Sequence, residues 1–213
     1  MRVIAIDGPS GSGKSTVARA LAHRLGLDYL DTGAMYRGVA FAALRRGIDP
    51  DETDRLAGLV LDLELTVGPE GVVVDGVDAT IEIRGPEVTR AVSDVAANAS
   101  VRRELVRRQR EWIEAHGGGV VEGRDIGTVV WPEADLKAYL TASLEIRAGR
   151  RSQEVVELDY EAVAADMARR DTVDAGREVD PLSMAHDAVV VDTSERPIDE
   201  VVDELLGLLE TGR

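Results

Sequence analysis

The 213-residue sequence contains no cysteine, which excludes disulfides and thiolate metal sites. Aromatic residues make up only 3% of the chain, so the predicted core consists of valine, leucine, isoleucine and alanine. No apolar run has the length of a membrane span, and no signal-peptide pattern precedes the first predicted strand. We therefore expect a cytoplasmic protein with no membrane partner.

Positive charge is also scarce. The chain has 25 Lys and Arg residues against 40 Asp and Glu, which gives a formal net charge of −15. Because this charge repels polyanions, we expect no nucleic-acid partner. A chain of this kind that binds a small anion has to gather its cations locally. Only two of those cations are lysines, Lys14 and Lys137.

One of these lysines lies in a phosphate-binding motif. The motif reads Gly8-Pro9-Ser10-Gly11-Ser12-Gly13-Lys14-Ser15-Thr16 and fits G-x-x-x-x-G-K-[ST]. An apolar run at residues 2–7 predicts a buried strand before it, and residues 15–25 predict a helix after it that ends at Gly26. Strand, glycine-rich loop and helix form the context that this motif requires.

The residue types of the loop explain how it binds a nucleoside triphosphate. Its glycines permit backbone angles at which N–H groups converge on phosphate oxygens, and the helix N-terminus adds partial positive charge. Lys14 supplies a cation for the β- and γ-phosphates, and the hydroxyl of Ser15 suits Mg²⁺. We predict that residues 8–16 bind ATP, with Lys14 as a catalytic residue and Ser15 as the metal ligand.

The remaining pattern predicts an α/β fold. Further apolar runs predict strands at residues 27–31, 120–122, 136–140 and 188–192. Helices are predicted between and after them, at residues 32–46, 51–61, 86–116, 144–153, 160–171 and 198–209. Such alternation indicates a three-layer α/β/α P-loop fold with a five-stranded parallel sheet. Residues 63–84 alternate around a turn at 68–71 and predict a small antiparallel meander, with its third strand at 77–84.

Three polar clusters follow predicted strands: the phosphate loop, residues 31–37 and residues 122–125. Ligands of parallel sheets bind at the carboxyl ends of the strands. The guanine-reading motif N/T-K-x-D and a D-x-x-G switch element are absent, and the apolar strand that would carry a motor's Asp ends in Glu122. A small-molecule kinase is favoured, because arginines occur in several segments around the strand ends. Arg45, Arg46, Arg103, Arg107 and Arg108 are assigned to the surface instead.

Residues 8–16, 31–37 and 122–130 together resemble bacterial cytidylate kinases, nucleoside monophosphate kinases that make CDP from CMP and ATP. The resemblance extends over essentially the full chain, including the meander and Arg107-Arg108-Gln109-Arg110. It implies one P-loop kinase domain, residues 1–213. Within that domain it implies an acceptor-nucleotide insertion at 34–106 and a helical lid at 146–178.

The resemblance also implies roles for individual residues. Asp125 would accept a hydrogen bond from the cytosine amino group, while Arg102 and Ser93 face the O2/N3 edge of the base. Arg37 and Arg124 would hold the acceptor phosphate, and Asp174 the ribose. The implied catalytic residues are Lys14, Arg124, Arg147 and Arg151, and the implied CMP-binding residues are Thr32, Tyr36, Arg37, Ser93, Arg102, Arg124, Asp125, Arg170, Asp174 and Arg177. ATP with Mg²⁺, CMP or dCMP, and a monomeric protein complete the expectation.

Two segments depart from the family pattern. Glu122 stands where an Asp is common, and residues 172–177 contain fewer arginines than some relatives have. Asp31 and Glu122 are candidates to order Mg²⁺-bound water, and Asp31 is also a candidate helix cap. A structural alternative for Asp125 is a helix cap or a pair with Arg124. The alternative functions are a small P-loop kinase for UMP or shikimate, and a nucleotide-binding module with little hydrolysis.

Overall fold

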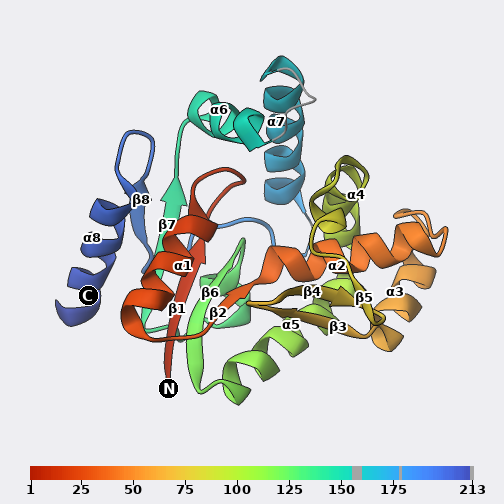
Figure 1. Cartoon of the computed structure of the whole chain (residues 1–213), viewed down its shortest axis with the longest axis horizontal. Coiled ribbons are helices and arrows are strands. Elements are labelled where there is room, and N and C mark those ends of the chain that lie inside the picture. The colour runs from red at the N-terminus through yellow and green to blue at the C-terminus, as the bar shows by residue number, and fades with distance from the viewer. Residues whose placement is uncertain (155–159, 178, 212–213) are drawn as a thin grey trace.

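A five-stranded parallel sheet forms the centre of the molecule (Figure 1). The computed structural model describes residues 1–154, 160–177 and 179–211. The strands follow the order β2-β6-β1-β7-β8 and comprise β1 (Arg2–Asp7), β2 (Tyr29–Asp31), β6 (Gly118–Gly123), β7 (Leu136–Thr141) and β8 (Val189–Asp192). The parallel sheet predicted from the sequence is confirmed, and β1 with its phosphate loop lies at its centre.

Side-chain alternation along β1 divides the core into two layers. Val3 and Ala5 pack on one side, against α2 (Thr32–Arg45), α3 (Thr53–Asp62), α4 (Pro86–Ala97) and α5 (Ala99–Ala115). Ile4 and Ile6 pack on the other, against α1 (Lys14–Leu25) and α8 (Ile198–Thr211). Successive side chains of a strand point to opposite faces, so one apolar strand supplies both layers. The three-layer α/β/α architecture is thereby confirmed.

The predicted meander is present, but its third strand is shorter than expected. β3 (Leu65–Gly68), β4 (Gly71–Val74) and β5 (Val77–Asp78) form an antiparallel sheet. The strand predicted at 77–84 is wrong beyond Asp78, because residues Glu82–Arg84 form a 3₁₀ turn, η1. The carboxylate of Asp78 accepts hydrogen bonds from the backbone N and the Oγ1 of Thr80, at 3.0 and 2.6 Å, which turns the chain away from the ladder.

The single helix predicted at 86–116 is two helices, α4 and α5, which meet at Asn98. The Oδ1 atom of Asn98 accepts hydrogen bonds from the backbone N atoms of Ser100 and Val101, at 2.9 and 3.2 Å. This is an N-cap, which starts a new helix in a new direction. After β6, the predicted loop also contains a π-helical turn, η2 (Ile126–Val130).

Two helices, α6 (Leu144–Glu154) and α7 (Tyr160–Gly176), stand above the carboxyl ends of the strands in Figure 1. They pack on each other through Ala148, Val163 and Met167. The lid predicted at 146–178 falls on this pair and stays a prediction, and residues 155–159 and 178 lie outside the described residues. In the described part of the chain, no helix combines the length and the apolar composition needed to cross a bilayer.

Candidate active site

A cleft of about 1010 Å³ opens at the carboxyl ends of β1, β2 and β6, beneath α6 and α7. Most of the predicted site residues line it, although they come from segments far apart in the sequence. These residues are Ser10, Gly11, Gly13, Lys14, Ser15, Thr16, Thr32, Tyr36, Arg37, Ser93, Arg102, Arg124, Asp125, Arg151, Arg170, Asp174 and Arg177. Gly8, Pro9, Ser12 and Arg147 do not line it.

The phosphate loop has an unusual backbone, fixed by bonds to its carbonyl groups. Gly8 has φ +144°, and a Cβ there would lie 2.0 Å from the carbonyl oxygen of Leu140, so glycine is required. The Nη1 atom of Arg124 donates to the carbonyl oxygen of Gly8 at 2.6 Å, and Lys14 Nζ donates to that of Pro9 at 2.7 Å. These bonds occupy carbonyl groups of the loop, and converging N–H groups in loops of this kind suit phosphate oxygens.

Burial is the main influence on Lys14. Loss of hydration, followed by the neighbouring charge of Arg124, lowers the pKa of Lys14 to about 7. The negative charges of Glu122, Asp7 and Asp31 act in the opposite direction. A buried cation of this kind is stabilised by an anionic ligand, which a triphosphate supplies.

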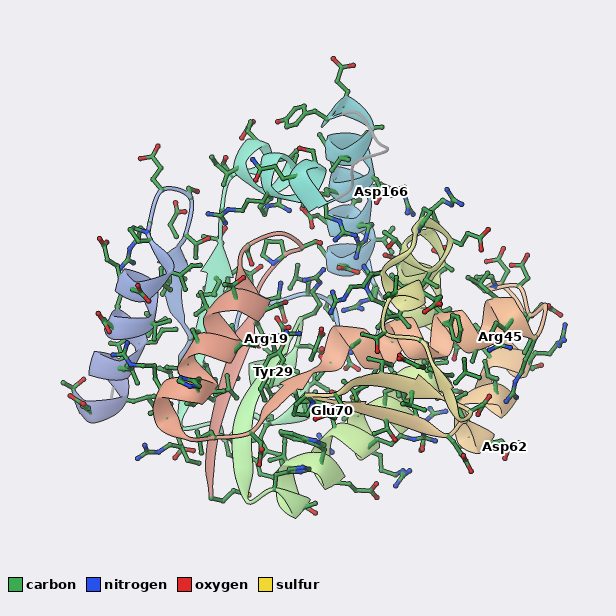
Figure 2. The ribbon with its side chains drawn as sticks, viewed as in Figure 1. Arg19, Tyr29, Arg45, Asp62, Glu70 and Asp166 are labelled. Atoms are coloured by element: carbon green, nitrogen blue, oxygen red, sulfur yellow. The ribbon has the colours of Figure 1, made fainter. Side chains whose placement is uncertain are left out.

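Glu122 organises the end of β6 beside the loop. Its carboxylate accepts hydrogen bonds from the hydroxyl of Ser15, at 3.1 Å, and from the hydroxyl of Tyr29. The ring of Tyr29 in turn lies 5.1 Å from the guanidinium of Arg19, and Figure 2 labels this pair beside α1. Burial, with the charge of Asp31, raises the pKa of Glu122.

The oxygen groups around Ser15 fit Mg²⁺. This ion prefers oxygen ligands and keeps several waters, with one or two protein contacts beside the substrate phosphates. Among the described residues no group of three or more acidic or histidine side chains forms a metal cage. The hydroxyl of Ser15, bonded to the carboxylate of Glu122, offers oxygen ligands of the kind that a nucleotide-bound magnesium ion uses. Asp31 caps α2, with Oδ1 accepting from the backbone N of Ala34 at 2.9 Å, and it also lines the cleft, so its role toward magnesium-bound water stays a prediction.

An arginine cluster lies between the loop and α4. Nη1 of Arg37 donates to the carbonyl oxygen of Ile83 at 2.9 Å and to Thr89 Oγ1 at 2.8 Å. Burial, followed by the charges of Arg170, Arg151 and Arg84, lowers the pKa of Arg37 to about 9. The Nε atom of Arg170 is buried and has no hydrogen-bond partner among the described residues. Converging cations with an unsatisfied donor suit a phosphate group.

Arg124 connects three parts of the site. Its Nε donates to Oδ2 of Asp174 on α7 at 2.8 Å, while its Nη1 bonds the phosphate loop. Because Arg124 follows β6 directly, the central sheet, the loop and the α6–α7 pair meet at one guanidinium. This position places the Arg124 guanidinium between the phosphate loop and α7, where it lines the cleft.

Four buried residues that line the cleft include an ion pair, and we call this group the base pocket: Arg102, Asp125, Tyr36 and Ser93. Nη2 of Arg102 pairs with Oδ2 of Asp125, and the Arg102 guanidinium lies 5.6 Å from the centre of the Tyr36 ring. Burial raises the pKa of Asp125, against the opposing charge of Arg102. The partner of Asp125 is thus Arg102, not Arg124, and its side chain does not cap η2.

Arg147 lies behind the loop. Its Nη1 donates to the carbonyl oxygen of Ser10 at 3.1 Å and pairs with Asp171 at 2.7 Å. One turn further on, Arg150 lines the cleft and donates to the Oγ1 and carbonyl oxygen of Thr193, at 3.1 and 2.6 Å. Sequence reasoning missed Arg150, although it lies on the same predicted helix.

Asp7 was also missed. Its carboxylate accepts hydrogen bonds from the backbone N atoms of Ile126, at 2.9 Å, and Gly127, at 2.8 Å. It thereby anchors the turn that follows Asp125 to the strand that precedes the phosphate loop. The available signal was a carboxylate at the end of an otherwise apolar strand, where burial requires a partner.

Comparisons with known proteins show the family to which the chain belongs. The sequence matches the family described as cytidylate kinase over residues 4–211. A cytidylate kinase of Nocardia farcinica is 53% identical over 211 residues, covering 95% of this chain and 91% of the relative. One of Rhodococcus opacus is 51% identical over 212 residues, covering 96% and 93%.

Among solved structures, a sugar kinase from Janibacter sp. HTCC2649 is 18% identical, covers 99% of this chain and 95% of its own, and has a TM-score of 0.51. At this identity the likeness concerns the fold alone. The family match and the relatives confirm the resemblance found in the sequence, and the chain belongs to the cytidylate kinase family.

Proposed function

We propose that the protein transfers the γ-phosphoryl group of ATP to CMP, and to dCMP, giving CDP and dCDP. The observation that carries this proposal is that the phosphate loop, the arginine cluster and the base pocket all line one cleft. Family membership supports the same reaction. The family resemblance supports a monomer, and the substrates suit a cytoplasmic location.

The base pocket would select cytosine by polarity. The amino group at position 4 of cytosine donates a hydrogen bond, which the Asp125 carboxylate accepts, while Arg102 and Ser93 donate to the O2/N3 edge. Uracil presents an acceptor at position 4 and would face Asp125 acceptor to acceptor. An unpaired buried polar group is a strong source of discrimination.

Catalysis would consist of positioning and charge neutralisation. Arg37, Arg124 and Arg170 hold the acceptor phosphate, and Asp174 and Arg177 hold the sugar. An ionised phosphate oxygen of the acceptor attacks the γ-phosphorus in line, the bond from the γ-phosphorus to the β–γ bridging oxygen breaks, and ADP leaves. The attacking oxygen is already ionised, so a general base has little to contribute. Lys14 and the arginines neutralise the charge that moves between the nucleotides. When bound, Mg²⁺ would add further neutralisation of the triphosphate, and the hydroxyl of Ser15 would hold it, with Glu122 as a candidate to order its water.

The α6–α7 pair would act as a lid. It carries Arg150, Arg151 and Arg170 over the phosphate loop, and closure on both nucleotides would exclude water from the transferring group. Arg147 would support the phosphate loop from α6, since its Nη1 donates to the carbonyl oxygen of Ser10 at 3.1 Å.

The decisive test is an ADP-release assay with ATP, Mg²⁺ and a panel of acceptors: CMP, dCMP, UMP and shikimate. We expect CMP and dCMP to support rapid turnover and UMP to be poorer by about 100-fold in kcat/KM. Preference for UMP or shikimate would overturn the assignment of the acceptor. ATP binding without acceptor-dependent ADP release would favour a nucleotide-binding module instead.

A further inference from the structure

A second carboxylate approaches the base pocket from the segment that follows α7. Oδ2 of Asp180 accepts a hydrogen bond from Nε of Arg102 at 3.0 Å. The side chain of Arg102 is 1% exposed and that of Asp180 is 26% exposed, so the pair lies at the edge of the buried pocket. Arg102 is thus held between two carboxylates, Asp125 on one side and Asp180 on the other.

The backbone of Asp180 is also unusual. Its φ is +49°, a region that residues with a side chain seldom adopt and that aspartate tolerates better than most. In this conformation its carbonyl oxygen accepts a hydrogen bond from Nη2 of Arg177 at 2.9 Å. A single residue therefore holds two arginines of the proposed acceptor site, one through its side chain and the other through its backbone.

The contacts of Arg102 show what the Asp180 carboxylate contributes. A guanidinium is a rigid planar fork, so fixing one edge fixes the direction of the others. Asp180 holds the Nε edge, Nη1 donates to the carbonyl oxygen of Ala96 at 3.4 Å, and Nη2 pairs with Oδ2 of Asp125. Among the residues that the structure describes, this leaves the Oδ1 atom of Asp125 for the amino group of a base.

We propose that Asp180 is a positioning residue that sets the preference for cytosine, because it holds the Arg102 guanidinium in the orientation in which a single nitrogen meets Asp125. This inference rests on the proposed function. Without the Asp180 carboxylate, the Nε edge loses its partner and the guanidinium turns to take both oxygens of Asp125. The acceptor for the cytosine amino group is then occupied, so cytosine binding weakens more than uracil binding.

Two substitutions of Asp180 distinguish the contribution of its carboxylate from that of its backbone carbonyl. Asp180→Gly removes the carboxylate and tolerates the positive φ, so the carbonyl bond to Arg177 is kept. Asp180→Asn keeps an oxygen for Nε but removes its charge. Asp75 offers a matched control: its φ is +50°, its carboxylate pairs with Arg46 at 2.6 Å, and neither residue lines the cleft. Asp75→Gly and Asp75→Asn therefore report any general effect of the same replacements.

The measurement is kcat and KM for CMP, UMP and ATP, together with thermal unfolding. Asp180→Gly should raise the KM for CMP about tenfold and lower the CMP-to-UMP ratio of kcat/KM by a similar factor, with kcat and the KM for ATP unchanged. Asp180→Asn should recover part of the loss. The Asp75 variants should keep the wild-type ratio even if their melting temperature falls.

An unchanged CMP-to-UMP ratio in Asp180→Gly would overturn the proposal, and so would an equal change in Asp75→Gly. The wild-type acceptor panel tests the proposed function separately. If the wild-type protein preferred another acceptor, the proposed function would fail, and an unchanged KM for that acceptor in Asp180→Gly would then overturn this inference as well.

Discussion

The two halves of the cleft, to which we assign the donor and the acceptor nucleotide, are built in different ways. The donor half is one continuous segment, residues 8–16, and it presents mainly backbone groups whose direction is fixed by Arg124, Lys14, Arg147 and Thr193. The acceptor half is assembled from side chains on α2, α4, α5 and α7 and on the turn after β6. Phosphate binding thus depends on a local conformation, while recognition of the acceptor depends on the whole fold.

The two halves also balance charge differently. In the base pocket, the cation Arg102 is paired with carboxylates. In the donor half, Lys14 is bonded to a backbone carbonyl, and burial lowers its pKa to about 7. Substitutions in the donor half should therefore abolish turnover, and substitutions in the acceptor half should change which nucleotide is used.

The largest expected effect is the loss of Lys14. Lys14→Ala removes the cation aimed at the transferring phosphoryl group and should lower kcat by about 1000-fold. The melting temperature should stay nearly the same or rise, because the substitution removes a buried and poorly hydrated cation. Steady-state kinetics at saturating CMP provides the measurement, and near-normal turnover would contradict the proposed mechanism.

The other lysine gives the control. Lys137 lies on β7, does not line the cleft, and pairs with Asp187 at 2.8 Å. Lys137→Ala should lower the melting temperature, since it leaves the Asp187 carboxylate without this partner, but it should keep kcat. The opposite behaviour of the two lysines distinguishes a catalytic cation from a structural one.

The second-largest expected effect is a change in base preference when Asp125 is substituted. Asp125→Asn replaces one acceptor oxygen by a donor, which suits O4 of uracil and repels the amino group of cytosine. The CMP-to-UMP ratio of kcat/KM should fall about 100-fold while the KM for ATP is retained. A ratio that stays constant while both acceptors lose activity would show that Asp125 supports Arg102 structurally and does not read the base.

Arg37 allows a finer test of the acceptor half. Arg37→Lys keeps the charge but loses the planar fork that donates to Ile83 O and Thr89 Oγ1. We expect the KM for CMP to rise about tenfold, with a smaller effect on the KM for ATP. Arg45→Lys on the same helix, beside Phe41 and outside the cleft, is the matched control and should change neither value.

The difference between a locally built half and a half assembled from distant segments also determines which features can be predicted from the sequence. The phosphate loop and most strands could be predicted, because their signals are local: glycine spacing, apolar runs and helix stops. The break at Asn98 and the turn at Asp78 were missed, although both residues are well-known cap and turn formers. In each case the apolar pattern continues on both sides of the residue. The pattern therefore does not reveal that the side chain accepts a hydrogen bond from the backbone and ends the regular element there.

The partners of the arginines could not be predicted. Arg147 and Arg150 are three residues apart on α6, yet Arg147 bonds the phosphate loop and Arg150 lines the cleft. The tertiary packing of α6 determines these different positions. Asp180 pairs with Arg102 across 78 residues of sequence. Such contacts depend on tertiary placement, so no periodicity reveals them.

Asp7 joins the two halves, and its titration gives the smallest expected effect. It ends β1 and bonds the turn after Asp125, and burial is the chief reason that its pKa is raised from 3.8 to about 6. Between these values the folded protein keeps a proton that the unfolded chain releases, so this contribution to stability is present at low pH and is lost as the pH rises through about 6. From pH 5 to pH 6 the loss is about 1 kcal/mol.

Asp7→Asn cannot titrate at this position, so comparison with the wild type isolates the effect. The wild-type free energy of unfolding minus that of the variant should fall by about 1 kcal/mol from pH 5 to pH 6, as measured by urea unfolding. If the difference is constant over this range, Asp7 is not protonated in the folded protein. The connection between the halves is then a charged one, and removing it should disturb ATP and CMP binding together.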